Sequence, residues 1–208
     1  MSQQETLNLR QTQVQTYVSF TSFMTAVVVF FTGLILTQFN TYDISIKVPL
    51  SFLMISISGF LFSTLIYTKV AESIAQRKLE IAKKNIFLGD IISEYIGVYL
   101  LILSIPLVVN VITDDIFLRL VTLFALFGGF GLYQFSHFSI IERHFKNSYH
   151  TFSLVLIALG ILLFFAQQYQ FYFIPLAGLT IAFILGITYI ACKKEVYYER
   201  KTQKSRSY

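Results

Sequence analysis

The hydrophobic residues of this chain fall in long blocks that short polar or charged segments separate. Six blocks have the length and apolar character of membrane-spanning helices, because a hydrocarbon core about 30 Å thick needs about 20 helical residues. The blocks cover residues 17–39, 48–69, 94–113, 116–141, 151–166 and 171–192. This pattern predicts an all-α integral membrane protein, in which a six-transmembrane-helix bundle forms a single transmembrane domain over residues 1–208.

The composition agrees with this class. Hydrophobic residues make up 55% of the chain and charged residues only 13%, whereas about a quarter of the residues in soluble proteins are charged. The first block lacks a basic segment before it and is longer than the core of a signal peptide, so we expect a retained span. The single cysteine, Cys192, excludes a disulfide within the chain.

The distribution of charge predicts the orientation in the membrane. Of the sixteen Lys and Arg residues, all except Lys47 and Arg119 lie in segments that share one side with the two chain ends. The positive-inside rule therefore predicts cytoplasmic N- and C-termini in a cell (inner or plasma) membrane. The same rule accounts for the net charge of +5, so we expect the lipid bilayer as a partner and no nucleic acid.

Two segments are expected to reach the cytoplasm. Segment 70–93 is rich in helix formers and predicts a helical cytoplasmic extension between spans two and three, which ends at Gly89. Its apolar positions recur at helical spacing at Val70, Ile74, Ile81 and Leu88, and a basic face carries Arg77, Lys83 and Lys84. That face would lie on anionic headgroups or pair with another copy. Residues 193–208 predict a basic, disordered tail.

Small residues recur along one side of several spans, where another helix can approach closely. Span two has Ser56, Gly59 and Ser63 on one side. The candidate helix-packing residues of spans four and six are Ala125, Gly129, Gly178, Ala182 and Gly186. The last three recur every fourth residue and predict a helix contact or a subunit interface, and hence a homo-oligomer.

A first group of candidate functional residues lies around the turn between spans three and four. Asp115 and Arg119 are one helical turn apart, and Asp114 is adjacent. One hypothesis is a vestibule that attracts ions, and the alternative is a capped helix start whose arginine extends to the membrane surface. Asn110 is expected near the same outer interface, as is an interfacial turn that contains Gln167, Gln168 and Gln170.

A second group is expected at the inner interface. His137 lies near the end of span four, Glu142 and His144 follow that span, and Glu94 begins span three. His137 and His144 are about 10 Å apart along a helix, which is too far for one metal ion without other ligands. His137 is therefore interpreted as an interface residue or as a proton sensor. Glu94 would pair with these histidines or with basic residues at the inner end of span four, as a structural lock or a gate.

The sequence contains no motif of a known catalytic site, and no cofactor or metal site is expected. The leading hypothesis is a non-enzymatic, self-associating protein that is channel-like or a membrane signalling component. The first alternative is a membrane subunit that docks a cytoplasmic protein partner on segment 70–93 or on the basic tail. The second alternative is a lipid-interface enzyme that uses His137, Glu142 and His144.

Overall fold

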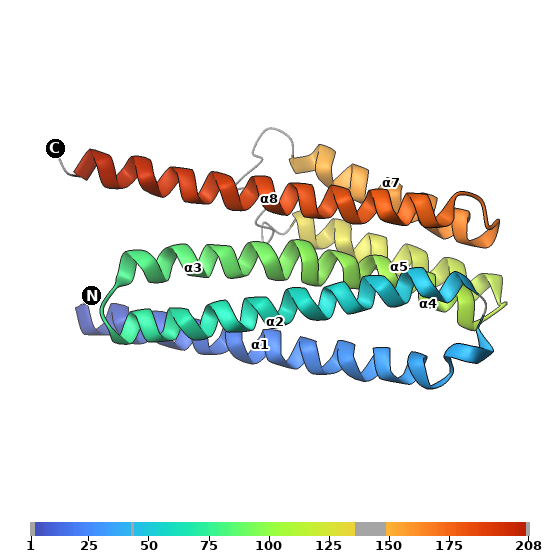
Figure 1. Ribbon diagram of the computed structural model, residues 1–208, viewed down its shortest axis with the longest axis horizontal. Helices are drawn as coiled ribbons and strands as arrows, with labels where there is room; N and C mark the ends of the chain where they lie inside the picture. The colour runs from blue at the N-terminus through green and yellow to red at the C-terminus, as the bar shows by residue number, and fades with distance from the viewer. Residues whose placement is uncertain (1–2, 43, 136–148, 207–208) are drawn as a thin grey trace.

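The computed structural model describes the backbone of residues 3–42, 44–135 and 149–206 and the side chains of residues 10–40, 42, 45–132 and 151–196. Every regular element in these ranges is a helix, and the helices lie side by side in one bundle (Figure 1). The helices are α1 (Gln3–Thr37), η1 (Phe39–Thr41), η2 (Ile44–Ile46), α2 (Lys47–Ala75), α3 (Leu79–Ile92), the π-helix η3 (Ser93–Val98), α4 (Tyr99–Ile112), α5 (Ile116–Phe135), α7 (Tyr149–Gln168) and α8 (Phe173–Arg206).

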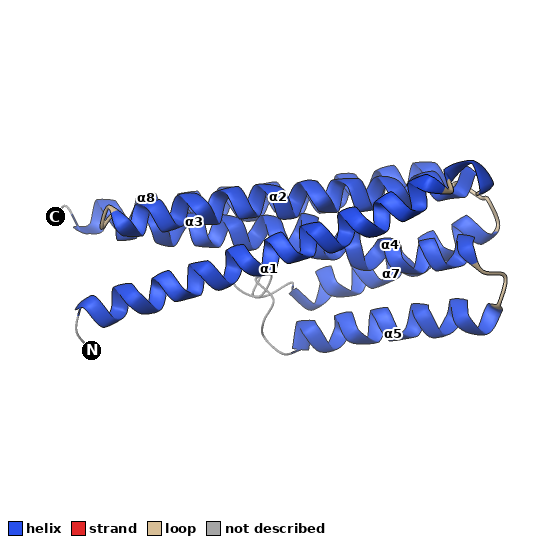
Figure 2. Cartoon of the chain, turned by 90° about the horizontal axis from the view of Figure 1, so that it is seen from below, coloured by secondary structure: helices blue, strands red, loops and turns tan. Residues whose placement is uncertain are grey.

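The bundle has two different ends. The tail end holds the start of α1, the end of α8 and the α2–α3 turn, and the loop end holds the α1–α2, α4–α5 and α7–α8 connections (Figure 1). Helices α5 and α7 occupy only the half next to the loop end, whereas α1, α2, α3 and α8 extend to the tail end (Figures 1 and 2). The half of the bundle near the tail end is therefore the thinner one.

Five segments are long and apolar enough to cross a membrane, which confirms the all-α membrane class. They are Arg10–Thr37, Lys47–Ala75, Leu79–Ile112, Thr151–Gln168 and Phe173–Val196. The apolar part of α5, Ile116–Leu132, is shorter, and residues 136–141 of the predicted fourth span lie outside the described residues. Six spans thus stay a prediction. The start of α1 and the end of α8 lie at the same end, as an even number of crossings requires (Figure 1).

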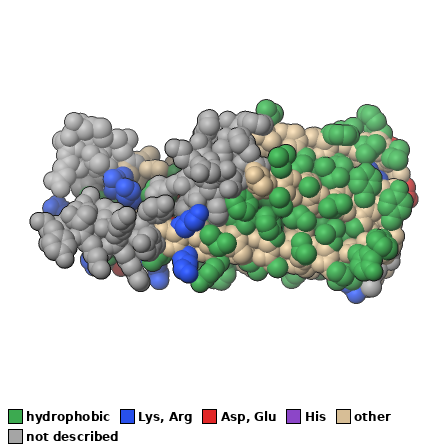
Figure 3. Space-filling view, turned by 90° about the horizontal axis from the view of Figure 1, so that it is seen from above, with side chains coloured by type: hydrophobic (Ala, Val, Ile, Leu, Met, Phe, Trp, Pro, Cys, Tyr) green, Lys and Arg blue, Asp and Glu red, His purple; other side chains and the backbone are tan. Residues whose placement is uncertain are grey.

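Side-chain chemistry divides the surface in the same way as the helix lengths. On the face seen in Figure 3, hydrophobic side chains cover the half next to the loop end, and most of the visible Lys and Arg lie toward the tail end. Exposed hydrophobic residues are expected where a protein contacts lipid chains, and cations where it meets headgroups and water. The loop-end half is therefore the part suited to the bilayer.

The prediction that a helix ends at Gly89 was wrong. Helix α2 ends at Ala75, and the chain reverses at Gln76, Arg77 and Lys78, where Arg77 has a φ of 58°. Helix α3 then continues past Gly89 into η3 and α4. A Cβ atom on Gly89 would lie 2.5 Å from Cε1 of Tyr67, so this glycine permits close packing of α3 on α2.

The predicted cytoplasmic extension is a helical hairpin. The apolar positions Val70 and Ile74 are buried with Val14 of α1 and Ala82 of α3, whereas Ile81 is 51% exposed. Two of the four predicted apolar positions, Val70 and Ile74, are thus covered by the chain itself, and Leu88 is half-buried. Helix α8 also extends through Arg206, where the sequence predicted a disordered tail.

A seam of small residues joins α2 to the α3–η3–α4 run. A Cβ atom on Gly59 would lie 2.7 Å from the backbone nitrogen of Gly97. On either side of this contact, Ser56 Oγ donates a hydrogen bond to Gly97 O at 2.7 Å, and Ser63 Oγ donates one to Gly89 O at 3.0 Å. The side of span two that the sequence marked with small residues is therefore a helix interface.

The other predicted small-residue sides face outward in the described bundle. Ala125, Gly129, Gly178, Ala182 and Gly186 are exposed. At Gly129, Gly178 and Gly186, a Cβ atom would meet no described atom within 4 Å. These residues are not used for packing within the described chain, and a subunit interface at them stays a prediction.

The seam predicts opposite effects for two matched substitutions. Gly97→Ala places a methyl group against the ring of Phe60 and should lower the free energy of unfolding by about 1–3 kcal/mol. Gly186→Ala adds the same methyl group in open space and should leave stability unchanged or slightly raised. Unfolding in mixtures of a mild detergent with SDS, followed by circular dichroism, measures both. Equal effects of the two substitutions would argue against the seam.

Candidate functional site

The turn between α4 and α5 is a capped helix start. The Asp115 carboxylate accepts hydrogen bonds from the backbone N–H groups of Phe117 at 2.8 Å and Leu118 at 3.2 Å. The Asp115 N–H donates to Thr113 Oγ1 at 3.1 Å. An acidic side chain in this position satisfies donors that the first helical turn leaves unpaired. Asp115 therefore acts as the N-cap of α5.

Arg119 pairs with Asp114 instead of with Asp115, its predicted neighbour one turn away. Its Nη2 atom lies 2.8 Å from Asp114 Oδ1, and its Nε donates to the carbonyl oxygen of Thr113. The Arg119 side chain is 16% exposed, whereas that of Asp114 is fully exposed. The guanidinium group is thus held at the loop end, as expected for an arginine that extends to the membrane surface.

A buried pair of amides lies next to this turn. Asn110 of α4 donates from Nδ2 to Gln167 Oε1 of α7 at 3.0 Å. Gln167 Nε2 donates to Leu107 O at 3.1 Å and to Ser45 O at 3.3 Å. The buried Gln167 side chain of α7 thereby forms hydrogen bonds with both α4 and η2.

One atom of this pair has no hydrogen-bond partner among the described residues. Asn110 Oδ1 is buried and accepts no hydrogen bond from any described residue, although Asn110 is only 6% exposed. A buried acceptor without a donor costs about 1–3 kcal/mol. Proteins rarely keep such a group unless water or a ligand satisfies it. The unsatisfied Asn110 oxygen is therefore expected to lower stability at the loop end.

Asn110, Gln167 and Arg119 line a common cavity of about 350 Å³, which we call the polar pocket. Gln168, Gln170, Asp114 and Tyr42 also line it. Uncharged amides outnumber charged groups in its wall, and Arg119 is the cation. The sequence placed most of these residues near the outer interface, but it did not indicate that they surround one cavity.

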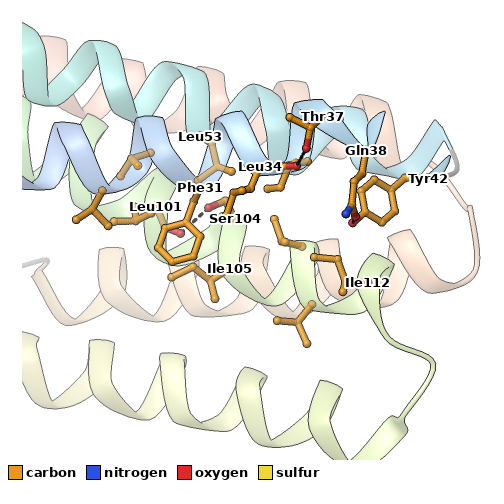
Figure 4. Close-up of a pocket in the computed structure, with 15 residues that line it drawn as sticks. Phe31, Leu34, Thr37, Gln38, Tyr42, Leu53, Leu101, Ser104, Ile105 and Ile112 are labelled. Carbon is orange, nitrogen blue, oxygen red and sulfur yellow. Dashed lines mark hydrogen bonds between the residues drawn. The ribbon is translucent and has the colours of Figure 1, made fainter. Parts of the chain in front are cut away.

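An apolar cavity of about 620 Å³ lies between α1 and α4, and we call it the apolar groove (Figure 4). Phe31 and Leu34 of α1 line one side, and Leu101 and Ile105 of α4 line the other. Toward the loop end, the wall becomes polar at Thr37 and Gln38, and the Tyr42 hydroxyl donates to Gln38 Oε1 at 2.8 Å. Tyr42 lines both cavities, so the groove and the polar pocket are neighbours at this residue.

Between the tail end and these cavities, apolar and aromatic side chains make up most of the described interior of the bundle. Tyr95 stacks on Tyr99 with ring centroids 5.4 Å apart, and Phe130 meets the edge of Tyr99 at 5.2 Å. Phe127 occupies the space that a side chain on Gly160 would need. This core does not resemble the lining of an aqueous pathway.

Glu94 lies inside the bundle. It is 5% exposed, belongs to η3, and accepts a hydrogen bond from the Tyr99 hydroxyl. Its predicted partners His137, Glu142 and His144 lie outside the described residues, so a lock or gate between them stays a prediction. Among the described residues, no three His, Cys, Asp or Glu side chains gather as they would around a metal ion.

Comparison of the chain with protein-family models, with curated proteins and with solved structures finds no match. The function is therefore inferred from the chemistry of the polar pocket and the apolar groove.

The amide pair predicts a specific pattern of stability. Gln167→Leu removes three hydrogen bonds and leaves Asn110 Nδ2 buried without an acceptor, so it should lower the free energy of unfolding by about 1–3 kcal/mol. The exposed neighbour Gln168 serves as the control, and Gln168→Leu should change the free energy by less than about 0.5 kcal/mol.

The double variant Asn110→Leu with Gln167→Leu replaces both polar partners by apolar groups of similar size, so it should recover part of the loss. The same detergent–SDS unfolding series measures the coupling. Strict additivity of the two single changes would show that the amides do not depend on each other.

Proposed function

We propose that this protein is a six-span membrane protein that binds an amphiphile of the bilayer at its loop end. The hydrocarbon chain of the amphiphile occupies the apolar groove, and its head reaches the polar pocket. The observation that carries this proposal is that Tyr42 lines both cavities, which places the apolar groove next to the polar pocket. Their volumes fall within the range of about 300–1,000 Å³ that is usual for small-molecule sites.

The position of the groove supports a hydrocarbon chain as its occupant. The groove is lined by the last turns of the candidate span Arg10–Thr37 and by the α4 part of Leu79–Ile112. Its wall is apolar at Phe31 and Ile105, and apart from Ser104 its polar residues lie near the loop end. A chain that enters from the surrounding lipid would meet apolar surface along its length and polar groups at its head.

The packed interior favours binding over conduction within one chain. Tyr95, Tyr99, Phe127 and Phe130 fill the core beside the cavities. A channel-like function would accordingly need a path between copies of the chain. We therefore keep self-association as a second proposal and assign the binding of an amphiphile to the single chain.

Self-association is supported by the contrast between two sets of glycines. Gly59, Gly89, Gly97 and Gly160 are covered by neighbouring helices, whereas the small residues of α5 and α8 lie open on the lipid-facing surface. Close approach of two helices at such positions is favourable in membranes because backbones gain van der Waals contacts. A signalling role would follow from an association that responds to the bound amphiphile.

The docking alternative rests on the tail end. The α2–α3 turn exposes Arg77 and Lys78, and Lys83 is exposed on the next turns of α3. A basic surface of this kind is suited to an acidic partner protein or to anionic headgroups.

A substitution that fills the groove tests the first proposal. Ile105→Trp places a large ring in the groove, and the purified chain should then retain much less co-purified lipid than the unchanged chain. Leu132→Trp is the control, because Leu132 is 73% exposed and does not line the groove. Native mass spectrometry after transfer into a mild detergent counts the retained lipids. Retention that Ile105→Trp leaves intact would contradict the proposal.

A bulky residue on the open side of α8 tests self-association. Gly186→Leu should weaken energy transfer between labelled copies in proteoliposomes, because the side chain keeps the two backbones apart. Gly33→Leu is the matched control on α1, since Gly33 is also exposed and a Cβ atom there meets no described atom within 4 Å. If both substitutions leave the signal at the level of the unchanged chain, α8 is not the interface.

A further inference from the structure

We infer that the turn between α2 and α3 docks a soluble protein partner whose contact surface carries carboxylates beside apolar side chains. The docking surface consists of the exposed side chains of Arg77, Lys78 and Ile81, and we call it the hairpin tip. This inference rests on the docking alternative and chooses one partner for it. It does not depend on the binding of an amphiphile, which concerns the loop end.

The backbone of the turn favours glycine at the position that Arg77 occupies. The Lys78 N–H donates to Ser73 O and the Arg77 N–H donates to Ile74 O, both at 2.9 Å. This is the Schellman arrangement, in which a left-handed residue, usually glycine, follows the helix. Arg77 has a φ of 58°, which costs a residue with a side chain more than it costs glycine. Residues held in this conformation cluster at functional sites, so we assign the Arg77 side chain a role outside the fold.

The cations of the hairpin tip are available to a partner. The side chains of Arg77 and Lys78 are exposed and form no ion pair or hydrogen bond with a described residue. The carboxylate of Glu72, in the last turn of α2, accepts a hydrogen bond from Gln76 Nε2 at 3.0 Å instead. A guanidinium group binds a carboxylate through two parallel hydrogen bonds. Acidic side chains are therefore the groups that Arg77 is suited to bind.

The neighbours of these cations favour a protein over a nucleic acid or a lipid surface. Ile81 is 51% exposed and lies one turn after Lys78, so it adds an apolar contact next to the charges. Arginine beside apolar side chains is common in protein interfaces. Glu72 and Glu80 are also exposed around the hairpin tip. These carboxylates would be repelled by a surface of phosphates, which is best met by uniform positive charge.

The length of α2 indicates that the hairpin tip faces water. Helix α2 has 29 residues, so it is about 43 Å long, which equals the thickness of a bilayer with its headgroups, about 40–45 Å. The turn lies at the tail end, beyond the half of the bundle that α5 and α7 occupy (Figures 1 and 2). Val70 and Ile74 are buried just before it, so a packed hairpin holds the tip in place. A soluble partner can therefore reach it.

The test uses the full chain in phosphatidylcholine nanodiscs and two labelled peptides of equal length and charge. One peptide alternates glutamate with leucine, and the other alternates glutamate with serine. Fluorescence anisotropy should show tighter binding of the leucine peptide, and Ile81→Ser should make the two affinities equal. Arg77→Gln should weaken binding about fivefold, the factor of an exposed ion pair. Lys47→Gln is the matched control, because it removes an exposed cation at the loop end and should leave binding unchanged.

A second variant of Arg77 separates binding from stability. Arg77→Gly should weaken binding of the leucine peptide as Arg77→Gln does, because both remove the guanidinium group. It should also raise the midpoint of detergent–SDS unfolding, because glycine adopts the positive φ without strain. A lower midpoint would show that the arginine stabilises the turn, and the inference would then fail.

The remaining outcomes decide the class of the partner. Failure of the leucine peptide to bind, equal affinities of the two peptides for the unchanged chain, or equal losses from Arg77→Gln and Lys47→Gln would each overturn the inference. Phosphatidylglycerol vesicles and a DNA oligonucleotide, at the same concentration of negative charge, should displace the leucine peptide less well than its unlabelled form. Better displacement by either would assign the tip to that class instead. None of these results bears on lipid retention, so the two proposals can fail separately.

Discussion

The contact between α2 and the α3–η3–α4 run supports the rest of the bundle. Two serine hydroxyls donate to backbone carbonyls across it, and glycines bring the two backbones together between them. In a hydrocarbon environment this matters more than in water, because nothing else can satisfy a carbonyl that leaves the regular helical pattern. The π-helix η3 is such a departure, and Ser56 accordingly bonds to Gly97, which belongs to it.

The position of the candidate site follows from this contact. Once α2 holds the α3–η3–α4 run, α4 faces α1 across the apolar groove and α7 across the amide pair. Both cavities therefore share α4 as a wall. Aromatic residues pack around Tyr99 in the interior of the bundle, so the ligand that we propose would reach the groove from the lipid and not through the core.

The amino-acid sequence predicts the class of this fold well and its details less well. Long apolar blocks identify the spans because the thickness of the bilayer leaves few alternatives. The sequence predicted a helix end at Gly89 because a glycine can stop a helix. A glycine can also permit a close helix contact, and Gly89 has this second role. The hairpin at Arg77 carries no Gly or Pro signal, since a residue of another type adopts its positive φ.

The candidate site was predictable only in part, for a similar reason. Asp114 and Arg119 stand out in the sequence as charges beside an apolar block, whereas Asn110 and Gln167 are ordinary polar residues near the ends of two helices. Their hydrogen bond joins positions 57 residues apart, and no local pattern reports a pairing over that distance. The lack of a described hydrogen-bond donor for Asn110 Oδ1 can be recognised only from the positions of the neighbouring residues in three dimensions.

The unbroken course of α3, η3 and α4 has a structural consequence. Residues Leu79–Ile112 form a single shaft of 34 residues, which at a rise of about 1.5 Å per residue is about 50 Å long. One extremity borders the cavities, and the other meets the basic turn at Lys78. The run therefore connects the cavities at one end of the bundle with the basic α2–α3 turn at the other end.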